Sequence, residues 1–212
     1  MMVASALWLA AIALAMCCDR VIAMWLHEWD VDLWLHTHKV VAEIVKAPGT
    51  YATTIVVAII VGRTHFKRSL ASWFVILATL LEGGIDFVLK WGTGRTRPFK
   101  LHASEAQPFV LSPFRGGVPG FLRSENLCFP SGHAALAFAT AAAVAMLWPH
   151  AKWRWIGYAI ASIVAIERVL ENSHWASDVV AGAALGVGTV HLTAWILTKL
   201  MPSREPQVAT VG

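Results

Sequence analysis

Six runs of apolar residues, separated by polar or charged segments, take up most of this chain. They extend over Val3–Leu26, Tyr51–Gly62, Leu70–Leu89, Ala134–Trp148, Trp155–Ile166 and Val179–Leu197. A helix needs about 20 mainly apolar residues to cross a bilayer, and the second run approaches that length only if it extends back through Val40. We therefore expect an all-α, polytopic membrane protein, built as a bundle of six transmembrane helices.

The composition favours a membrane protein over a soluble domain or a disordered chain. Of the 212 residues, 57% are hydrophobic and 14% are charged, whereas about 25% of a typical soluble domain is charged. A disordered chain would be poor in large apolar residues. The net charge of +4 comes from basic residues that occur singly or in small groups, which argues against a nucleic-acid partner and favours the anionic headgroups of a lipid bilayer.

The first apolar run is interrupted by Asp19 and Arg20, so either the span ends near Cys18 or this pair lies near a membrane interface. A cleaved signal peptide is the alternative, but no Lys or Arg precedes the run and no convincing cleavage site follows Met16. We expect a retained span. The spacing of the three cysteines indicates no disulfide framework and no metal site.

An amphipathic stretch from Trp29 to Lys46 predicts an interfacial helix, which Pro48 and Gly49 end before the second span. Tryptophans gather at the expected span ends, as in the aromatic belt of a membrane protein. These are Trp25, Trp29, Trp34, Trp148, Trp153, Trp155 and Trp175. We expect them to act as membrane anchors.

Basic residues in the connections predict the orientation of the chain. Seven of them share one side in the six-span arrangement: Arg63, Lys67, Arg68, Lys152, Arg154, Lys199 and Arg204. The positive-inside rule makes that side cytoplasmic. It places the long loop from Lys90 to Pro130 at the extracytoplasmic face of the cell (inner) membrane. We expect one domain over residues 1–202, a disordered polar cytoplasmic tail over 203–212, and a lid around Gly116–Gly120.

Three segments carry polar groups that a membrane protein avoids unless it uses them. They are Lys90–Pro98, Phe129–His133 and Arg168–Asp178, and all three fall at the same membrane face in the six-span arrangement. Lys90, Arg97 and Arg168 supply three fixed cations, of which the two guanidinium groups can bind oxyanions in a bidentate manner.

Two further groups of residues add the chemistry of phosphoryl transfer. Ser131, Gly132 and His133 open an expected helix, whose unsatisfied N–H groups can hold an anion that the glycine lets approach. His174 and Asp178 are four residues apart and would share one face of a helix. A carboxylate beside an imidazole is the arrangement of an activated histidine, which leaves His133 to protonate a leaving group. Together these residues predict a phosphoryl-transfer site that needs no metal and no cofactor.

In this order, the patterns K-x6-RP, PSGH and R-x5-H-x3-D resemble the three signature motifs of the type 2 phosphatidic acid phosphatase (PAP2) family, which includes vanadium haloperoxidases and glucose-6-phosphatase. The resemblance implies a role for each motif residue. Lys90, Arg97 and Arg168 would hold the phosphate oxygens, with hydrogen bonds from Ser131 and the Gly132 amide. His174 would attack phosphorus to form a phosphohistidine, with Asp178 orienting its ring. His133 would protonate the departing alcohol before water releases phosphate.

The third motif departs from the family pattern at one position. Ser usually precedes its arginine, whereas Glu167 precedes Arg168 here and a second acid, Glu171, follows one turn later. These acids either pair with Arg168 or alter the substrate pocket, and the attacking groups are intact.

Several other polar residues have an ordinary interpretation. Glu82, Asp86 and Lys90 are spaced by four residues, which predicts a salt-bridge ladder; the alternative is that Asp86 positions Lys90 for phosphate. A zinc site from His133, His174 and Asp178 is conceivable by ligand type, but three adjacent cations oppose a dication. The remaining loop cations are expected to be headgroup contacts or solvated charges, and the loop cysteine a bystander. They are Arg95, Lys100, Arg115, Arg123 and Cys128.

We therefore expect a metal-independent membrane phosphatase that hydrolyses a lipid phosphate or diphosphate monoester through a phosphohistidine. Candidate substrates are phosphatidate, phosphatidylglycerophosphate, undecaprenyl diphosphate and lipid A. A phosphotransferase or a vanadate-dependent haloperoxidase on the same site remains an alternative, as does a non-enzymatic lipid-binding or transport protein. None of the three motifs contains a residue that selects the alcohol or defines the oligomeric state.

Overall fold

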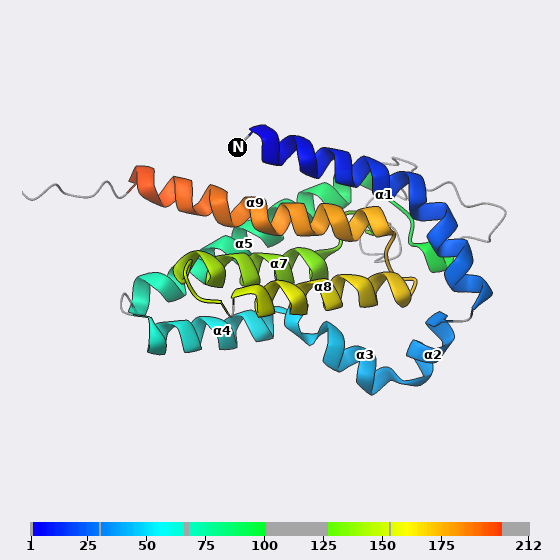
Figure 1. The fold of residues 1–212 in the computed structure, drawn as a ribbon, viewed down its shortest axis with the longest axis horizontal. Coiled ribbons are helices and arrows are strands. Elements are labelled where there is room, and N and C mark those ends of the chain that lie inside the picture. The colour runs from blue at the N-terminus through cyan, green and yellow to red at the C-terminus, as the bar shows by residue number, and fades with distance from the viewer. Residues whose placement is uncertain (1, 30, 66–67, 101–126, 153, 201–212) are drawn as a thin grey trace, which may run out of the picture.

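The computed structural model describes residues 2–29, 31–65, 68–100, 127–152 and 154–200, and every regular element within them is helical (Figure 1). The longer helices are α1 (Met2–Glu28), α4 (Tyr51–Thr64), α5 (Arg68–Thr93), α7 (Gly132–Leu147), α8 (Arg154–Leu170) and α9 (Ala176–Leu200). Each of the six expected apolar segments forms one of these helices, which confirms the all-α fold.

Short helices occupy the predicted amphipathic segment and the first loop motif. They are α2 (Val31–Thr37), α3 (Lys39–Lys46) and the 3-10 helices η1 (Ala47–Gly49) and η2 (Pro98–Lys100). Pro48 and Gly49 end α3 as expected, because proline cannot continue the helical hydrogen bonding. The expected lid and tail, together with Arg115 and Arg123, lie outside the described residues.

Within the described part of the chain, three helical segments are long and apolar enough to cross a bilayer alone: Ser5–Glu28, Ser69–Thr93 and Ala176–Leu200. A fourth span results if the bent pair Lys39–Gly49 and Tyr51–Thr64, which meet at 51°, counts as one. Helix α7 has only 16 residues, or about 24 Å at 1.5 Å per residue, which is shorter than a hydrocarbon core of about 30 Å. Three or four spans therefore meet the length criterion, and the six-span arrangement stays a prediction.

Large apolar side chains cover the outer faces of the helices, while charged side chains lie inside. The exposed ones include Leu7, Leu14, Val21, Ile55, Ile59, Trp73, Leu80, Ile156, Ile163 and Trp195. Acidic and basic side chains such as Asp19, Glu82 and Arg95 are buried. This inverted distribution is stable where lipid, rather than water, surrounds the bundle, and it identifies a multi-pass membrane protein.

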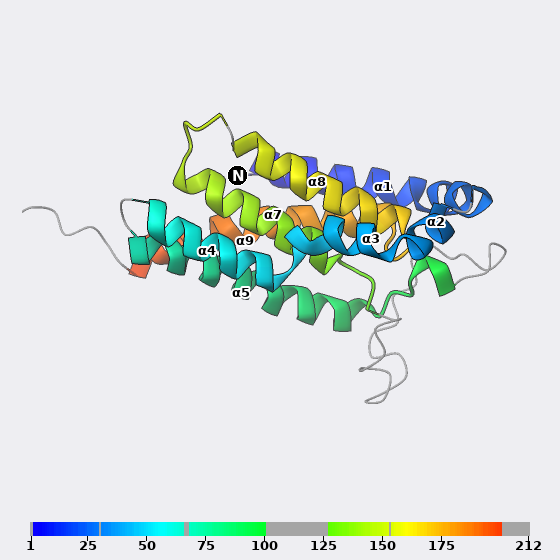
Figure 2. The ribbon, with the colours of Figure 1, turned by 90° about the horizontal axis from the view of Figure 1, so that it is seen from below.

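Helix α7 lies at the centre of the bundle and packs against α4, α5, α8 and α9 (Figures 1 and 2). Most of its buried residues are alanines, because neighbouring helices approach it closely on several sides. Two glycines of α9 provide the closest approach: a Cβ at Gly182 would lie 2.5 Å from the Ser131 carbonyl oxygen, and one at Gly186 would lie 2.2 Å from that of Ala135. This packing fixes the start of α7, where the second motif lies.

One of the expected membrane anchors is a core residue. Trp175 is only 2% exposed, its Nε1 donates a hydrogen bond to the Thr96 carbonyl oxygen at 3.0 Å, and the Arg95 guanidinium lies over its ring. The aromatic-belt prediction is therefore wrong for Trp175. Trp175 attaches the loop of the first motif to the segment that precedes α9.

Candidate active site

A cavity of about 350 Å³ opens between α5, η1 and the start of α7, and it brings the three motifs together. Five of the eight predicted site residues line it: Lys90, Arg97, Gly132, His133 and His174. They come from the end of α5, the loop after it, the first turn of α7 and the segment before α9. Two cationic side chains and two histidines therefore face one space.

The position of Lys90 is set by Asp86, one turn earlier on α5, whose Oδ2 accepts a hydrogen bond from the Lys90 ammonium group. A Cβ at Gly132 would lie only 2.8 Å from Lys90 Nζ, so the lack of a side chain at Gly132 lets the ammonium group lie close to the start of α7. Within the series Glu82, Asp86 and Lys90, the ion pair observed is that of Asp86 with Lys90, and Glu82 Oε1 has no hydrogen-bond partner among the described residues. The geometry thus favours the alternative in which Asp86 positions Lys90.

Ser131 is the N-cap of α7, yet its hydroxyl makes no capping hydrogen bond. The side chain is fully buried, and its Oγ has no partner in the described part of the chain. The Ser131 N–H donates to the Asp178 carbonyl oxygen at 3.0 Å, which ties the helix start to α9. Because the capping position is unused, the first N–H groups of α7 are available to an anion.

His174 and Asp178 contact each other, but not on one helix face as predicted. Helix α9 begins at Ala176, so His174 lies in the preceding turn, and its Nδ1 is 3.5 Å from Asp178 Oδ2. Asp178 is fully buried in the first turn of α9 and also accepts a hydrogen bond from the Trp175 N–H at 2.9 Å. Placing Nδ1 toward the carboxylate leaves the Nε2 atom as the nucleophile of the ring.

Burial lowers the pKa of His174 from 6.5 to about 4, and the neighbouring Asp178 opposes this shift only in part. The imidazole is consequently neutral at pH 7. A neutral ring has the lone pair that nucleophilic attack requires, so burial keeps His174 in its reactive form.

Arg95 is the main site residue that the sequence-based interpretation missed. It was expected to be a headgroup contact or a solvated charge, but it is only 2% exposed. Its Nη1 donates a hydrogen bond to Asp178 Oδ1, and its Nη2 donates one to Asp19 Oδ2 at 2.7 Å. Asp19 also accepts from the N–H and hydroxyl of Ser177, at 2.9 and 2.5 Å. The expectation for Arg95 is wrong because two buried carboxylates require a buried cation.

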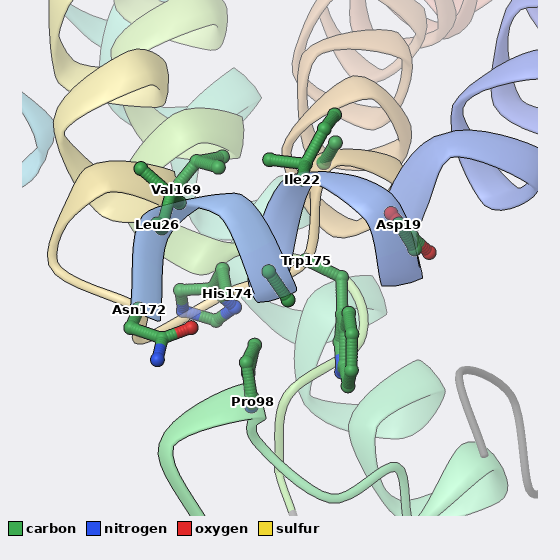
Figure 3. Close-up of a pocket in the computed structure, with 10 residues that line it drawn as sticks. Asp19, Ile22, Leu26, Pro98, Val169, Asn172, His174 and Trp175 are labelled. Atoms are coloured by element: carbon green, nitrogen blue, oxygen red, sulfur yellow. The ribbon is translucent and has the colours of Figure 1, made fainter. Parts of the chain in front are cut away.

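Helix α1 contributes directly to this region through the same network. Its Asp19, Ile22 and Leu26 border a small space next to His174 and Trp175, with Pro98 on the other side (Figure 3). Asp19 interrupts an apolar run, and a buried acid in such a run needs a partner. That signal was present in the sequence, but it did not identify Arg95.

Cys128 is a second residue whose expected role as a bystander is wrong. Its thiol is completely buried and donates a hydrogen bond to Asp178 Oδ2, with the sulfur 2.7 Å from the oxygen and 3.5 Å from His174 Nδ1. Burial and the Asp178 charge raise the pKa of the thiol well above its ordinary value. The neutral thiol therefore helps to fix the carboxylate that faces His174.

Arg168 does not line the cavity. Its Nε and Nη2 bind the two carboxylate oxygens of Glu167 at 2.5 Å, and its Nη1 lies 2.9 Å from Glu171 Oε2. Of the two alternatives for these acids, pairing with Arg168 is the one observed. Contact between Arg168 and a phosphate would require this buried cluster to rearrange.

Cys128, His174 and Asp178 form a group that could hold a metal ion by residue type, because among the described residues their possible ligand atoms lie within 4.8 Å of one another. The zinc set considered from the sequence has His133 in place of Cys128. The thiol and the carboxylate of this group already bind each other, and Arg95 binds the same carboxylate. The donor set thus serves an internal hydrogen-bond network next to two cationic side chains.

A family model described as "PAP2 superfamily" matches residues 71–202 of this chain. Among curated proteins, a lipid A 1-phosphatase of Rhizobium johnstonii is 31% identical over 154 residues, which are 68% of this chain and 59% of that protein. An undecaprenyl-diphosphatase of Sulfolobus acidocaldarius is 38% identical over 80 residues, 36% of this chain and 38% of that protein.

A third curated relative, a lipid A 1-phosphatase of Porphyromonas gingivalis, is 43% identical over 70 residues, 32% of this chain and 16% of that protein. The matches thus span at most about three fifths of the length of these three relatives. A crystal structure of a transmembrane PAP2-type phosphatidylglycerolphosphate phosphatase from Bacillus subtilis has the same fold, with a TM-score of 0.58 and 21% identity over 93% of this chain and 96% of that one.

Proposed function

This chain belongs to the PAP2 superfamily, and from that membership we propose that it is a metal-independent membrane phosphatase that hydrolyses a lipid-borne phosphate. The observation that carries the proposal is the cavity in which Lys90 and Arg97 face the two histidines, His133 and His174. Fixed cations around a phosphoryl group stabilise the charge of its transition state without a metal ion. The curated relatives bearing lipid phosphatase names are consistent with this chemistry.

We assign the steps of the reaction as follows. Lys90, Arg97 and the N–H groups that open α7 bind the phosphate oxygens, next to the Ser131 hydroxyl. Nε2 of His174 attacks phosphorus, the bond from phosphorus to the alcohol oxygen breaks, and His133, in the protonated form that the negative charge of a bound phosphate favours, gives its proton to that oxygen. His133 then takes a proton from water, the water oxygen attacks phosphorus, and the N–P bond breaks to release phosphate and free His174.

The roles of the remaining predicted residues follow from their contacts. Asp178 holds the Nδ1 side of His174, so that the ring presents Nε2 to the cavity. Arg168 is proposed as a phosphate ligand only after it leaves Glu167 and Glu171, and in the arrangement observed it acts as the counter-charge of both acids.

The proposed setting is a single domain over residues 1–202 that crosses the inner membrane six times, with the active site at the extracytoplasmic face. Substrate would enter sideways from the bilayer. Lipid A, undecaprenyl diphosphate and phosphatidylglycerophosphate are the candidate substrates that the names of the relatives suggest.

Phosphate release from a panel of these lipids, with purified protein in detergent and EDTA, tests the proposal. The wild type should release phosphate, and His174→Ala should reduce the rate by about a thousandfold or more, as removal of a nucleophile does. His191→Ala, an exposed histidine on α9, is the matched control and should retain activity. Activity that survives His174→Ala would contradict the phosphohistidine, and activity lost on adding EDTA would contradict metal independence.

A further inference from the structure

The active-site cavity continues past the motif residues toward the middle of α5. Beyond Lys90 and His133 it is lined by Tyr51, Glu82, Gly83 and Leu136. Glu82 lies two turns before Lys90 on the same face of α5, and Asp86, which binds the Lys90 ammonium group, lies between them, only about 6 Å from Glu82 along the helix axis. None of the three motifs contributes a residue to this end.

Glu82 is the unusual residue of the inner end. It is only 1% exposed, and its Oε1 has no hydrogen-bond partner anywhere in the described part of the chain. Asp86, one turn closer to Lys90, also has an unpartnered carboxylate oxygen, Oδ1, while its Oδ2 binds Lys90. A buried acceptor without a donor is costly, so either oxygen would gain by accepting a hydrogen bond from a bound molecule.

The neighbouring residues give this inner end a polar and an apolar side. Gly83 has no side chain, and the Tyr51 hydroxyl occupies the space where its Cβ would be, at 1.9 Å from that position. A hydroxyl therefore lies beside Glu82 and provides a second polar contact at the same end. Leu136 of α7 provides the apolar side of the cavity.

We propose that this inner end is a subsite for the leaving alcohol, and that Glu82 accepts a hydrogen bond from a hydroxyl or amide N–H group of that alcohol. The inference rests on the proposed phosphatase activity. With phosphate at Lys90 and Arg97, and with His133 as the acid, the atoms that follow the departing oxygen can reach toward Glu82. The substrate class is then a phosphate monoester of a polyol or sugar that carries donors within several bonds of the ester oxygen.

This chemistry separates the candidate substrates. The glycerol of phosphatidylglycerophosphate carries a hydroxyl and the amino sugar of lipid A carries amide and hydroxyl donors. The leaving group of undecaprenyl diphosphate is the polyprenyl monophosphate, whose chain carries no such donor, so it would leave the Glu82 oxygen buried without a partner. Sites built to bind a substrate hydroxyl discriminate strongly against analogues that lack it, for this reason.

A matched pair of substrates tests the subsite directly. The pair is phosphatidylglycerophosphate and an analogue in which 1,3-propanediol replaces the glycerol headgroup, so that one secondary hydroxyl is lost. We expect the wild type in detergent to show a kcat/KM at least about tenfold higher for the hydroxylated substrate, because a site built to bind a substrate hydroxyl discriminates against the analogue that lacks it. Glu82→Leu should bring this ratio to about one, and Glu82→Gln should retain part of it because an acceptor oxygen remains.

The controls separate this proposal from the phosphatase activity itself. Glu28→Gln changes an exposed acid at the end of α1 and should leave the ratio unchanged. A wild-type ratio near one, or a ratio that Glu82→Leu does not alter, overturns the subsite while leaving the phosphatase intact. If Glu82→Leu fails to fold, the kcat/KM ratios of the wild type and of Glu82→Gln test the subsite in its place. Absence of phosphate release from both substrates, or release that survives His174→Ala, would instead contradict the proposed function.

Discussion

Asp19 and Asp178 share one guanidinium group: Arg95 Nη2 binds Asp19 in α1, at 2.7 Å, and Arg95 Nη1 binds Asp178 in α9. All three side chains are buried. The contact joins the first helix of the chain, which lies outside the matched family region, to the carboxylate that orients His174. Helix α1 is therefore part of the framework around the proposed active site.

This sharing predicts an order of stabilities. Arg95→Met should lower the free energy of unfolding by about 3–5 kcal/mol, because it leaves two buried carboxylates without a cation. Asp19→Asn should have a smaller effect, since Arg95 keeps Asp178 as its partner. Chemical unfolding in detergent measures both, with Arg63→Met, an exposed residue of α4, as the control. Equal unfolding midpoints for Arg95→Met and Asp19→Asn would contradict the charge argument.

The shifted pKa of His174 predicts a pH dependence of stability. Between about 4, the folded value, and 6.5, the ordinary value, the unfolded chain binds more protons than the folded protein. The free energy of unfolding should therefore fall as the pH decreases through this window, and the contribution of His174 should be complete above it. Thermal unfolding in detergent should show a smaller fall for His174→Gln than for the wild type, whereas the exposed His191→Gln should match the wild type. An identical fall in all three proteins would exclude His174 as the cause.

Cys128 offers a test of how closely Asp178 must be held. Cys128→Val removes the donor to Asp178 Oδ2 and should lower kcat by about tenfold with little change in KM, since the loss of a hydrogen bond to a charged group is worth about 1.5 kcal/mol. Cys128→Ser keeps a donor and should lie closer to the wild type. Steady-state kinetics on one lipid phosphate measures both, with Cys17→Val, an exposed residue of α1, as the control. If Val and Ser at this position gave the same kcat, the thiol would not act through Asp178.

The close contact of α7 with α9 predicts a position-specific effect of glycine replacement. Gly186→Ala places a methyl group 2.2 Å from the Ala135 carbonyl oxygen and should destabilise the protein by about 1–3 kcal/mol or more. Gly188→Ala is two residues further along the same helix, where a Cβ meets no atom within 4 Å, and should be tolerated. Thermal unfolding of the two variants compares them, and the contact is refuted if both are equally stable.

The six helices and the motif residues of the cavity could be predicted from the sequence. Apolar runs near the length of a bilayer crossing form helices for local reasons, because each backbone hydrogen bond is satisfied within its own segment. Lys90, Arg97, Gly132, His133 and His174 are singled out by their polar chemistry among apolar runs and by the resemblance of their motifs to a known family, and they share one cavity. Each motif lies at or next to a helix end, which limits the positions that its residues can take.

The tertiary structure alone decided how the buried charges are paired. The sequence placed Asp19 in an apolar run, Arg95 in a loop and Cys128 before the second motif, but nothing local joins them. They meet at Asp178 because helix packing excludes water there, and each buried charge or donor must then find its partner inside the protein. The same packing turns Arg168 toward Glu167 and Glu171, and at the inner end of the cavity it leaves Glu82 Oε1 without a hydrogen-bond partner among the described residues.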